Sequence, residues 1–296
     1  MARITSHWYG GTLKGIFISD IHGNIPRYQH LFQIIRKETP DAVFFGGDLL
    51  PLHLAKHSTM EEFIETTVFS EIKKTQEHSD KKIRFFIIMG NDDPRMYEPL
   101  FVKADTKGIL DYVHQKTISY KKQYITGYSY VPPTPFQLKD WERYDLSQYV
   151  DVGAVSPEQG KRTIPIPLDE IKYSTIADDL ETLVKQSPVR KTIYLFHSPP
   201  YNSCLDRADL HGKKVDHAPI DVHVGSIAIQ RFIHDHQPLL TLHGHVHESS
   251  QITGQWKEKI GNTYSLSAAH QGPELAVVRF DTNHLDDATR EIVDVS

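Results

Sequence analysis

Short apolar runs alternate with longer amphipathic stretches along the first part of the chain. The run LKGIFIS at 13–19 precedes IPRYQHLFQIIRKE, DAVFFGG precedes a helical stretch around residues 58–78, and KIRFFIIMG follows. Such runs, rich in β-branched and aromatic residues, are typical of buried strands, whereas apolar positions with a period of 3.6 predict amphipathic helices. This alternation of strands and helices predicts an α/β fold.

The second half of the chain predicts further strands around an irregular middle. These strands are KTIYLFH (191–197), PLLTLHG (238–244), TYSLSA and LAVVRFD. The stretches YVPPTPFQLKDWERYD and TIPIPLDEIKYS contain prolines that interrupt long regular elements. We expect a single domain over residues 1–296 with a lid-like insertion around residues 128–175; a solvated linker is the alternative.

Composition narrows the classes of partner. The 33 basic and 38 acidic residues are well mixed and give a formal net charge of -5, so bulk nucleic-acid binding is not expected. A single cysteine, Cys204, excludes an intramolecular disulfide and a thiolate-rich metal site, and suits a reducing compartment. The first fifteen residues lack the features of a secretory signal, and no apolar run approaches the ~20 residues of a membrane span. We therefore expect a cytoplasmic protein without membrane contact.

Five of the predicted strands end in side chains that can bind a metal ion. These side chains are Asp20 and His22, Asp48, Asn91, His197, and the pair His245 and His247. Sites in α/β sheets form beyond the carboxyl ends of strands, so neighbouring strands would bring these residues together. Residues two positions apart in an extended chain point the same way, which would let each D-x-H or H-x-H pair face one pocket.

The donor types indicate the kind of metal. Carboxylate, imidazole and amide donors without sulfur suit Mn, Fe, Zn, Co or Ni, and seven such residues are more than one ion needs. Two divalent ions that share a bridging carboxylate would use all of them. The two histidines His245 and His247 would then each bind a different ion, with His243 an inward-facing strand residue.

The order of these motifs resembles the calcineurin-like metallophosphoesterase superfamily. The motifs are D-x-H at 20–22, GD at 47–48, GN at 90–91, a histidine after a strand at 197, and GHVH at 244–247. The stretches HSPPYNSCLDRADL and DVHVGSIAIQRFI further resemble a bacterial and archaeal branch of these phosphoesterases. The motifs span most of the chain, but residues 120–190 carry none of them.

The resemblance implies a fold and a set of ligands. The fold is a four-layer α-β-β-α sandwich, in which helices flank two mixed β-sheets, and it is known as the metallo-dependent phosphatase fold. Asp20, His22 and His247 would hold one ion, Asn91, His197 and His245 the other, and Asp48 would bridge them. Hydroxide that bridges the two ions would attack phosphorus, without a covalent enzyme intermediate.

One position departs from the pattern of the superfamily. Many members have histidine directly after the GN asparagine, whereas this chain has Asp92, which cannot supply a cationic proton donor. We therefore expect either a good leaving group or another acid. The histidines of HGKKVDHAPIDVH provide two candidates, His223 and His217, although both could be ordinary loop histidines.

The expected function is hydrolysis of a small phosphate ester, a phosphodiester or a nucleotide, with a phosphomonoester of another kind as an alternative. Asp48, Asn91, Asp92 and His223 would form the catalytic set, and manganese would be one suitable metal. The second hypothesis is a non-catalytic scaffold protein, which failure to bind metal would support. A nuclease would need a basic groove, and a protein phosphatase would carry GNHE and GDxVDRG segments, where this chain has GNDD and GDLLP. The aromatic residues Tyr130, Phe136 and Trp141 would either stack on a base or pack in the core.

Overall fold

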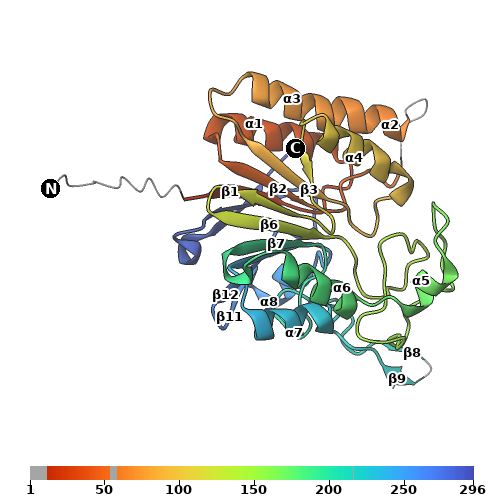
Figure 1. Cartoon of the computed structure of the whole chain (residues 1–296). Helices are drawn as coiled ribbons and strands as arrows, with labels where there is room; N and C mark the ends of the chain where they lie inside the picture. The colour runs from red at the N-terminus through yellow and green to blue at the C-terminus, as the bar shows by residue number, and fades with distance from the viewer. Residues whose placement is uncertain (1–11, 54–58, 216) are drawn as a thin grey trace.

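The computed structural model describes residues 12–53, 59–215 and 217–296 and contains two six-stranded sheets that lie face to face (Figure 1). In spatial order the first sheet consists of β14 (Thr289–Val293), β13 (Leu275–Asp281), β1 (Lys14–Ile18), β2 (Ala42–Gly46), β3 (Arg84–Ile88) and β4 (Asp111–Tyr112). The second consists of β11 (Lys257–Ile260), β12 (Thr263–Ser267), β10 (Leu240–His243), β7 (Thr192–Phe196), β6 (Gln123–Tyr128) and β5 (Thr117–Tyr120). Both sheets are mixed, since four neighbouring strands in each pair in parallel and the remaining strands pair antiparallel.

Helices cover the outer face of each sheet (Figure 1). Those over the first sheet are α1 (Ile25–Glu38), α2 (Met60–Phe63), α3 (Ser70–Glu77) and α4 (Glu98–Thr106). Those over the second are α6 (Ile176–Leu183) and α7 (Ile227–His236), with α8 (Ser249–Thr253) beside them. The shorter elements are η1 (Ile64–Phe69), η2 (Arg95–Tyr97), α5 (Leu168–Tyr173), η3 (Val184–Gln186), η4 (Val189–Lys191), β8 (Lys214–Val215), β9 (Ala218–Pro219) and η5 (Leu285–Asp287). The predicted four-layer α-β-β-α sandwich is confirmed.

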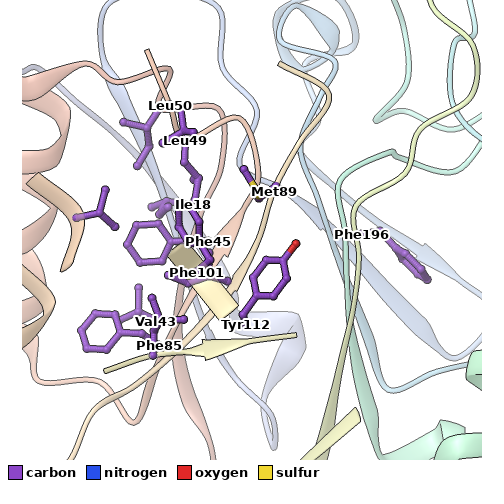
Figure 2. Close-up of a cluster of buried hydrophobic side chains, with 14 of the residues drawn as sticks. Ile18, Val43, Phe45, Leu49, Leu50, Phe85, Met89, Phe101, Tyr112 and Phe196 are labelled. Carbon is purple, nitrogen blue, oxygen red and sulfur yellow. The ribbon is translucent and has the colours of Figure 1, made fainter. Parts of the chain in front are cut away.

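Strands β2, β3 and β7 are buried on both faces, which explains their largely apolar sequences. On β2, Phe44 points between the two sheets, where it stacks on Phe86 with ring centroids 5.3 Å apart. The next residue, Phe45, points to the opposite face and packs beneath the helices, together with Phe85 and Ile18 (Figure 2). This period of two fixes which residues face the helices, and it leaves the strand ends free to carry polar side chains.

The strand predictions and the helix over residues 25–38 are confirmed, but the sequence did not predict the hairpin β5–β6. Strand β6 lies inside the second sheet, where it pairs in parallel with β7 and antiparallel with β5. Its sequence QYITGY mixes glutamine, threonine and glycine with apolar residues and so lacks the apolar run of β2 or β3.

The irregular middle of the chain is attached to the sandwich at several points. The indole Nε1 of Trp141 donates a hydrogen bond to the carbonyl oxygen of Asp93 at 2.8 Å, and the carboxylate of Asp145 accepts from the first amides of α7. Trp141 is fully buried and Tyr130 almost so, whereas Phe136 is 57 % exposed. Core packing is therefore the role of the first two aromatic residues, and the lid-like interpretation of residues 128–175 within a single domain stays a prediction.

Within the ranges that the structure describes, no helix is both long enough and apolar enough to span a membrane. Residues 1–11, most of the stretch considered for a secretory signal, lie outside the described residues.

Candidate metal centre

The seven predicted ligands all follow strands at the same end of the two sheets. Strands β1, β2 and β3 are parallel neighbours, and they deliver the segments that carry Asp20, Asp48 and Asn91. In the facing sheet, β7 and β10 are parallel neighbours and deliver His197 and the GHVH segment. Parallel pairing gathers the ligands within each sheet, and the facing sheets then bring together residues as far apart in sequence as Asp20 and His247.

The backbone at these positions is left-handed, not extended as expected. Positive φ angles occur at Asp20 (57°), His22 (49°), Asp48 (52°) and His245 (73°). Such angles are uncommon for residues other than glycine and cluster at functional sites. The side chains of each D-x-H or H-x-H pair thus converge through tight turns, and the reasoning from an extended chain was wrong for these segments.

The turns are held by hydrogen bonds between the loops that follow β1 and β2. The amide of Asp20 donates to the carbonyl oxygen of Gly47 at 3.0 Å, and the amide of His22 donates to that of Asp48 at 2.8 Å. Close approach also requires glycine at position 90, since a Cβ atom there would lie 2.3 Å from Oδ1 of Asp48. The loops that carry the acidic ligands are therefore packed closely against one another.

Four of the predicted ligands form a first cluster. Asp20, His22, Asp48 and His247 each offer one donor atom within 4.8 Å of all the others. Nε2 of His247 lies 3.3 Å from Oδ1 of Asp20 and 3.2 Å from Nε2 of His22. This cluster contains the three residues predicted to hold the first ion, together with the predicted bridge.

A second cluster shares Asp48 with the first. Donor atoms of Asp48, His197 and His245 also lie within 4.8 Å of one another. Nε2 of His197 is 3.2 Å from Oδ2 of Asp48 and 3.0 Å from Oδ1 of Asn91. The same carboxylate therefore takes part in both groups of donors, as expected of a residue between two ions.

The distances between donors fit a transition-metal site. With metal–nitrogen bonds of about 2.1 Å, two histidine ligands at tetrahedral or right angles have nitrogens roughly 3.0–3.4 Å apart. The separation of 3.2 Å between the Nε2 atoms of His22 and His247 falls in this range. The set of imidazole, carboxylate and amide donors also matches the preference of Mn, Fe, Zn, Co and Ni.

The charges of the centre are balanced between carboxylates and imidazoles. Burial opposes ionisation of Asp20, but the hydrogen bond and charge of His247 lower the pKa of Asp20 to about 2. Burial likewise opposes protonation of His197, but the charge of Asp48 raises the pKa of His197 to about 10. The pKa of His247 rises to about 9 against burial, because His247 bonds to Asp20. Protons and metal ions therefore compete for the same nitrogen lone pairs.

His245 differs from these two histidines. Burial, together with the positive charge of His197, lowers the pKa of His245 to about 3, so its imidazole stays neutral. Its amide donates to Oδ1 of Asp20 at 3.0 Å, which connects the GHVH segment to the first loop. A neutral imidazole beside Asp48 and His197 has the protonation state that a metal ligand requires.

Asp92 occupies the position after the GN asparagine and contacts the centre through both its backbone and its side chain. Its amide donates to Oδ1 of Asp48 at 2.8 Å, and its Oδ2 lies 3.7 Å from Nδ1 of His22. Nδ2 of Asn91 donates to Oδ1 of Asp92 at 3.0 Å, which directs Oδ1 of Asn91 towards His197. Burial, reinforced by the charge of Asp48, raises the pKa of Asp92 to about 6.

Two residues that support the ligands were not found from the sequence. Asp93 is fully buried, and its carboxylate accepts hydrogen bonds from the amides of Leu49, Leu50 and Gly90. Arg27 on α1 donates to the carbonyl oxygen of Asp20 at 2.9 Å and also to the segment at Gly272. Both act on backbone atoms of ligand loops, a role that leaves no spacing pattern in the sequence.

The remaining histidines separate into different roles. His243 is buried in β10 and bonds to the carbonyl oxygen of Ser198 and to Thr241, in agreement with its expected place in a strand. His217 is exposed in the turn between β8 and β9. His223 is partly buried, and its Nδ1 lies 2.7 Å from Oδ1 of Asp206.

Comparisons with known proteins find a matching family model and solved structures of similar fold. The family model described as calcineurin-like phosphoesterase matches residues 13–249. The structure of TT1561 from Thermus thermophilus is similar at 16 % identity and a TM-score of 0.55, over 97 % of this chain and all of that one. A dimetal phosphatase from Danio rerio is similar at 12 % identity and a TM-score of 0.52, over 96 % of this chain and 99 % of that one. At these identities the two structures indicate a shared fold, and no curated protein matches the sequence.

Proposed function

The chain belongs to the calcineurin-like phosphoesterase family and is a metal-dependent phosphoesterase, and from this premise we propose that its strand-end centre binds two divalent ions and hydrolyses a small phosphate ester. The observation that carries the proposal is the position of Asp48. Its carboxylate belongs to both clusters of donors, one with Asp20, His22 and His247, the other with His197 and His245. Asn91 completes the second cluster through its Oδ1 atom.

The proposed ligands form two groups that correspond to the two clusters of donor atoms. Asp20, His22 and His247 would hold one ion, Asn91, His197 and His245 would hold the other, and Asp48 would contribute to both sets. Two such ions, when bound, polarise the phosphoryl oxygens and lower the pKa of water so that it attacks phosphorus in line with the leaving group.

Other residues of the protein orient the proposed ligands. The amide of Asp92 fixes Oδ1 of Asp48, so that Oδ2 faces His197 at 3.2 Å and His22 at 3.9 Å. Arg27 and Asp93 hold the backbone of the loops that carry Asp20, Asp48 and Asn91. Groups of this kind raise metal affinity because they fix the ligands before the ion arrives.

We propose a phosphodiester, which includes a cyclic or linked nucleotide, as the substrate class. Asp92 places an additional carboxylate beside the centre, 3.7 Å from His22. A phosphomonoester dianion meets more repulsion from this carboxylate than a phosphodiester monoanion does. The mixed surface charge supports a small substrate over a nucleic acid. A cytoplasmic location stays a prediction from the sequence.

The experiment is hydrolysis of bis-p-nitrophenyl phosphate and p-nitrophenyl phosphate by metal-stripped protein to which Mn, Fe, Zn, Co or Ni is returned. We expect metal-dependent turnover, two ions per chain, and a higher kcat/KM for the diester. The Asp48→Asn variant should lose both activity and one or two ions. Asp41→Asn is the matched control, because Asp41 precedes β2 as Asp48 follows it, and it pairs with Lys121 far from the ligands.

The results of this experiment distinguish diester hydrolysis from monoester hydrolysis and from a scaffold function. A higher kcat/KM for the monoester would overturn the diester assignment but keep the two-metal centre. Failure to bind metal would support a scaffold function, and metal-independent turnover would contradict the proposed centre.

A further inference from the structure

Asp206 is a buried carboxylate outside the metal centre with an unusual number of donors. It has no exposed surface, and it accepts hydrogen bonds from the amides of Asn202, Ser203 and Gly225. Its Oδ1 also lies 2.7 Å from Nδ1 of His223. A buried carboxylate with several backbone donors is held in one orientation, so its bond to His223 is fixed as well.

The contact with Asp206 determines which nitrogen of the His223 ring carries a proton. A carboxylate can only accept, so Nδ1 of His223 carries a proton and donates it to Oδ1 of Asp206. Nε2 is then the atom available for proton exchange. The His223 side chain keeps 19 % of its surface exposed, and the ring of Tyr201 lies edge-on to it at 5.8 Å. An imidazole whose Nδ1–H is held by a carboxylate is fixed in one tautomer and one orientation.

The segment that carries His223 is attached to both histidine-bearing loops of the centre. On one side, the amide of Ser226 donates to the carbonyl oxygen of Pro199, two residues after His197. On the other side, His223 pairs with Arg207, whose amide donates to Oγ of Ser249, two residues after His247. Arg207 and Ser226 therefore attach the segments on either side of His223 to the two loops that carry the histidine ligands.

None of the proposed metal ligands is assigned as the proton donor for the leaving group. The leaving oxygen of an ester needs a proton unless the alcohol is a strong acid, and Asp92 stands where many family members carry a histidine. We propose that His223 donates this proton through Nε2 and that Asp206 is the positioning residue that orients it. The inference rests on the proposed phosphoesterase function.

In the proposed step, the bond between phosphorus and the leaving oxygen breaks, and its electron pair stays on that oxygen. The leaving oxygen takes the proton from Nε2 of His223 and departs as the neutral alcohol. Water supplies the new oxygen on phosphorus and releases a proton to solvent. His223, now neutral, recovers a proton from solvent before the next turnover.

Two variants separate proton donation from a structural role of the loop. In His223→Asn, the side-chain amide nitrogen replaces Nδ1 as the donor to Asp206, but nothing replaces Nε2. In Asp206→Asn, Nε2 is retained while the orienting carboxylate is lost. Both variants are compared with the wild-type protein, loaded with metal, on aryl methyl phosphates whose phenols range from p-nitrophenol to unsubstituted phenol.

We expect His223→Asn to lower kcat on the phenol ester by about 100-fold or more, the range for loss of a general acid, and on the nitrophenol ester by about tenfold or less. Asp206→Asn should likewise lower kcat more on the phenol ester than on the nitrophenol ester. Equal losses across the series in His223→Asn, whatever its melting temperature, would overturn the inference. Absence of turnover by the wild-type protein on every ester would instead contradict the proposed function.

Discussion

Nδ1 of His197 lies 2.7 Å from the carbonyl oxygen of Gly46, the last residue of β2. A carbonyl can only accept, so this contact places a proton on Nδ1 and turns Nε2 towards Asn91 and Asp48. Both of these neighbours present oxygen acceptors to Nε2. A cation must therefore lie along this side of the ring, either a proton on Nε2 or a metal ion that replaces it.

Binding of metal should therefore release protons. We expect at least one proton per chain to leave when the second cluster is filled at pH 7, because Nε2 of His197 cannot hold a proton and a metal ion together. Calorimetric titration of Mn or Zn into stripped protein, in two buffers that differ in enthalpy of ionisation, measures this number. In His197→Asn the released protons and the number of bound ions should both decrease. Equal heats in both buffers would contradict the assignment.

Asp93 should matter for both stability and metal affinity. Asp93→Asn turns an amide group towards backbone donors at Leu49, Leu50 or Gly90, and an unsatisfied buried donor costs about 1–3 kcal/mol in free energy of unfolding. Because the same amides position the loops of Asp48 and Asn91, metal affinity should fall about 10–100-fold. Urea unfolding and a competitive metal titration measure the two effects.

The control for Asp93 is Asp140→Asn. Asp140 is also buried and accepts from the amides of Arg95 and Thr163, but it lies in the irregular middle of the chain. Its substitution should lower stability by a similar amount and leave metal affinity within a factor of about three. An equal loss of metal affinity in the two variants would mean that Asp93 acts through general stability alone.

His114 should make the protein less stable in mild acid. Burial, followed by the charges of Arg95 and Arg143, holds the pKa of His114 well below 6.5. The unfolded chain therefore takes up this proton first as pH falls, and stability is complete above pH 6.5 and decreases below it. Between pH 7.5 and 5.5 this residue should account for a loss of about 1.4 kcal/mol.

The measurement for His114 is urea unfolding of metal-free protein at the two pH values, compared with His114→Gln. The neutral amide cannot take up a proton, so the variant should lose less stability over this interval than the wild-type protein. Other buried groups contribute equally to both proteins and cancel in the difference. Identical pH dependence in both would mean that His114 takes up its proton as readily in the folded protein as in the unfolded chain.

Trp141 should hold the irregular middle of the chain against the loop after β3. Trp141→Phe removes the hydrogen bond to the carbonyl oxygen of Asp93 and leaves this buried acceptor without its partner, at a cost of about 1–3 kcal/mol. We expect faster limited proteolysis within residues 129–167 and a lower melting temperature. Trp256→Phe, at a partly buried position before β11, is the control. Unchanged cleavage in Trp141→Phe would show that other contacts hold this region.

Much of the fold was predictable because its inner strands are buried on both faces. Strands such as β2 read as unbroken apolar runs, and a polar residue directly after such a run marks the strand end, as Asp48 does. The hairpin β5–β6 was missed because Thr126 and Gly127 occupy an inner strand without such a run. Its place depends on pairing with β7, which is a long-range contact and leaves no local pattern.

The donor set of the centre was readable from residue types and order, but the groups that support it were not. Arg27 and Asp93 bind backbone atoms of the ligand loops, and in the sequence neither can be distinguished from an ordinary surface charge. The left-handed turns at Asp20 and His245 were also unexpected, because such angles are uncommon for any residue other than glycine. Their conformation is imposed by packing between loops.

The left-handed backbone at Asp20, His22, Asp48 and His245 also determines how costly a substitution is at each position. Each non-glycine residue in such a conformation carries a conformational penalty of about 1–2 kcal/mol, which glycine does not. A change to glycine at His22 or His245 would therefore relieve this penalty while it removes a proposed metal ligand, whereas at Asp20 or Asp48 it would also leave a backbone amide without its acceptor.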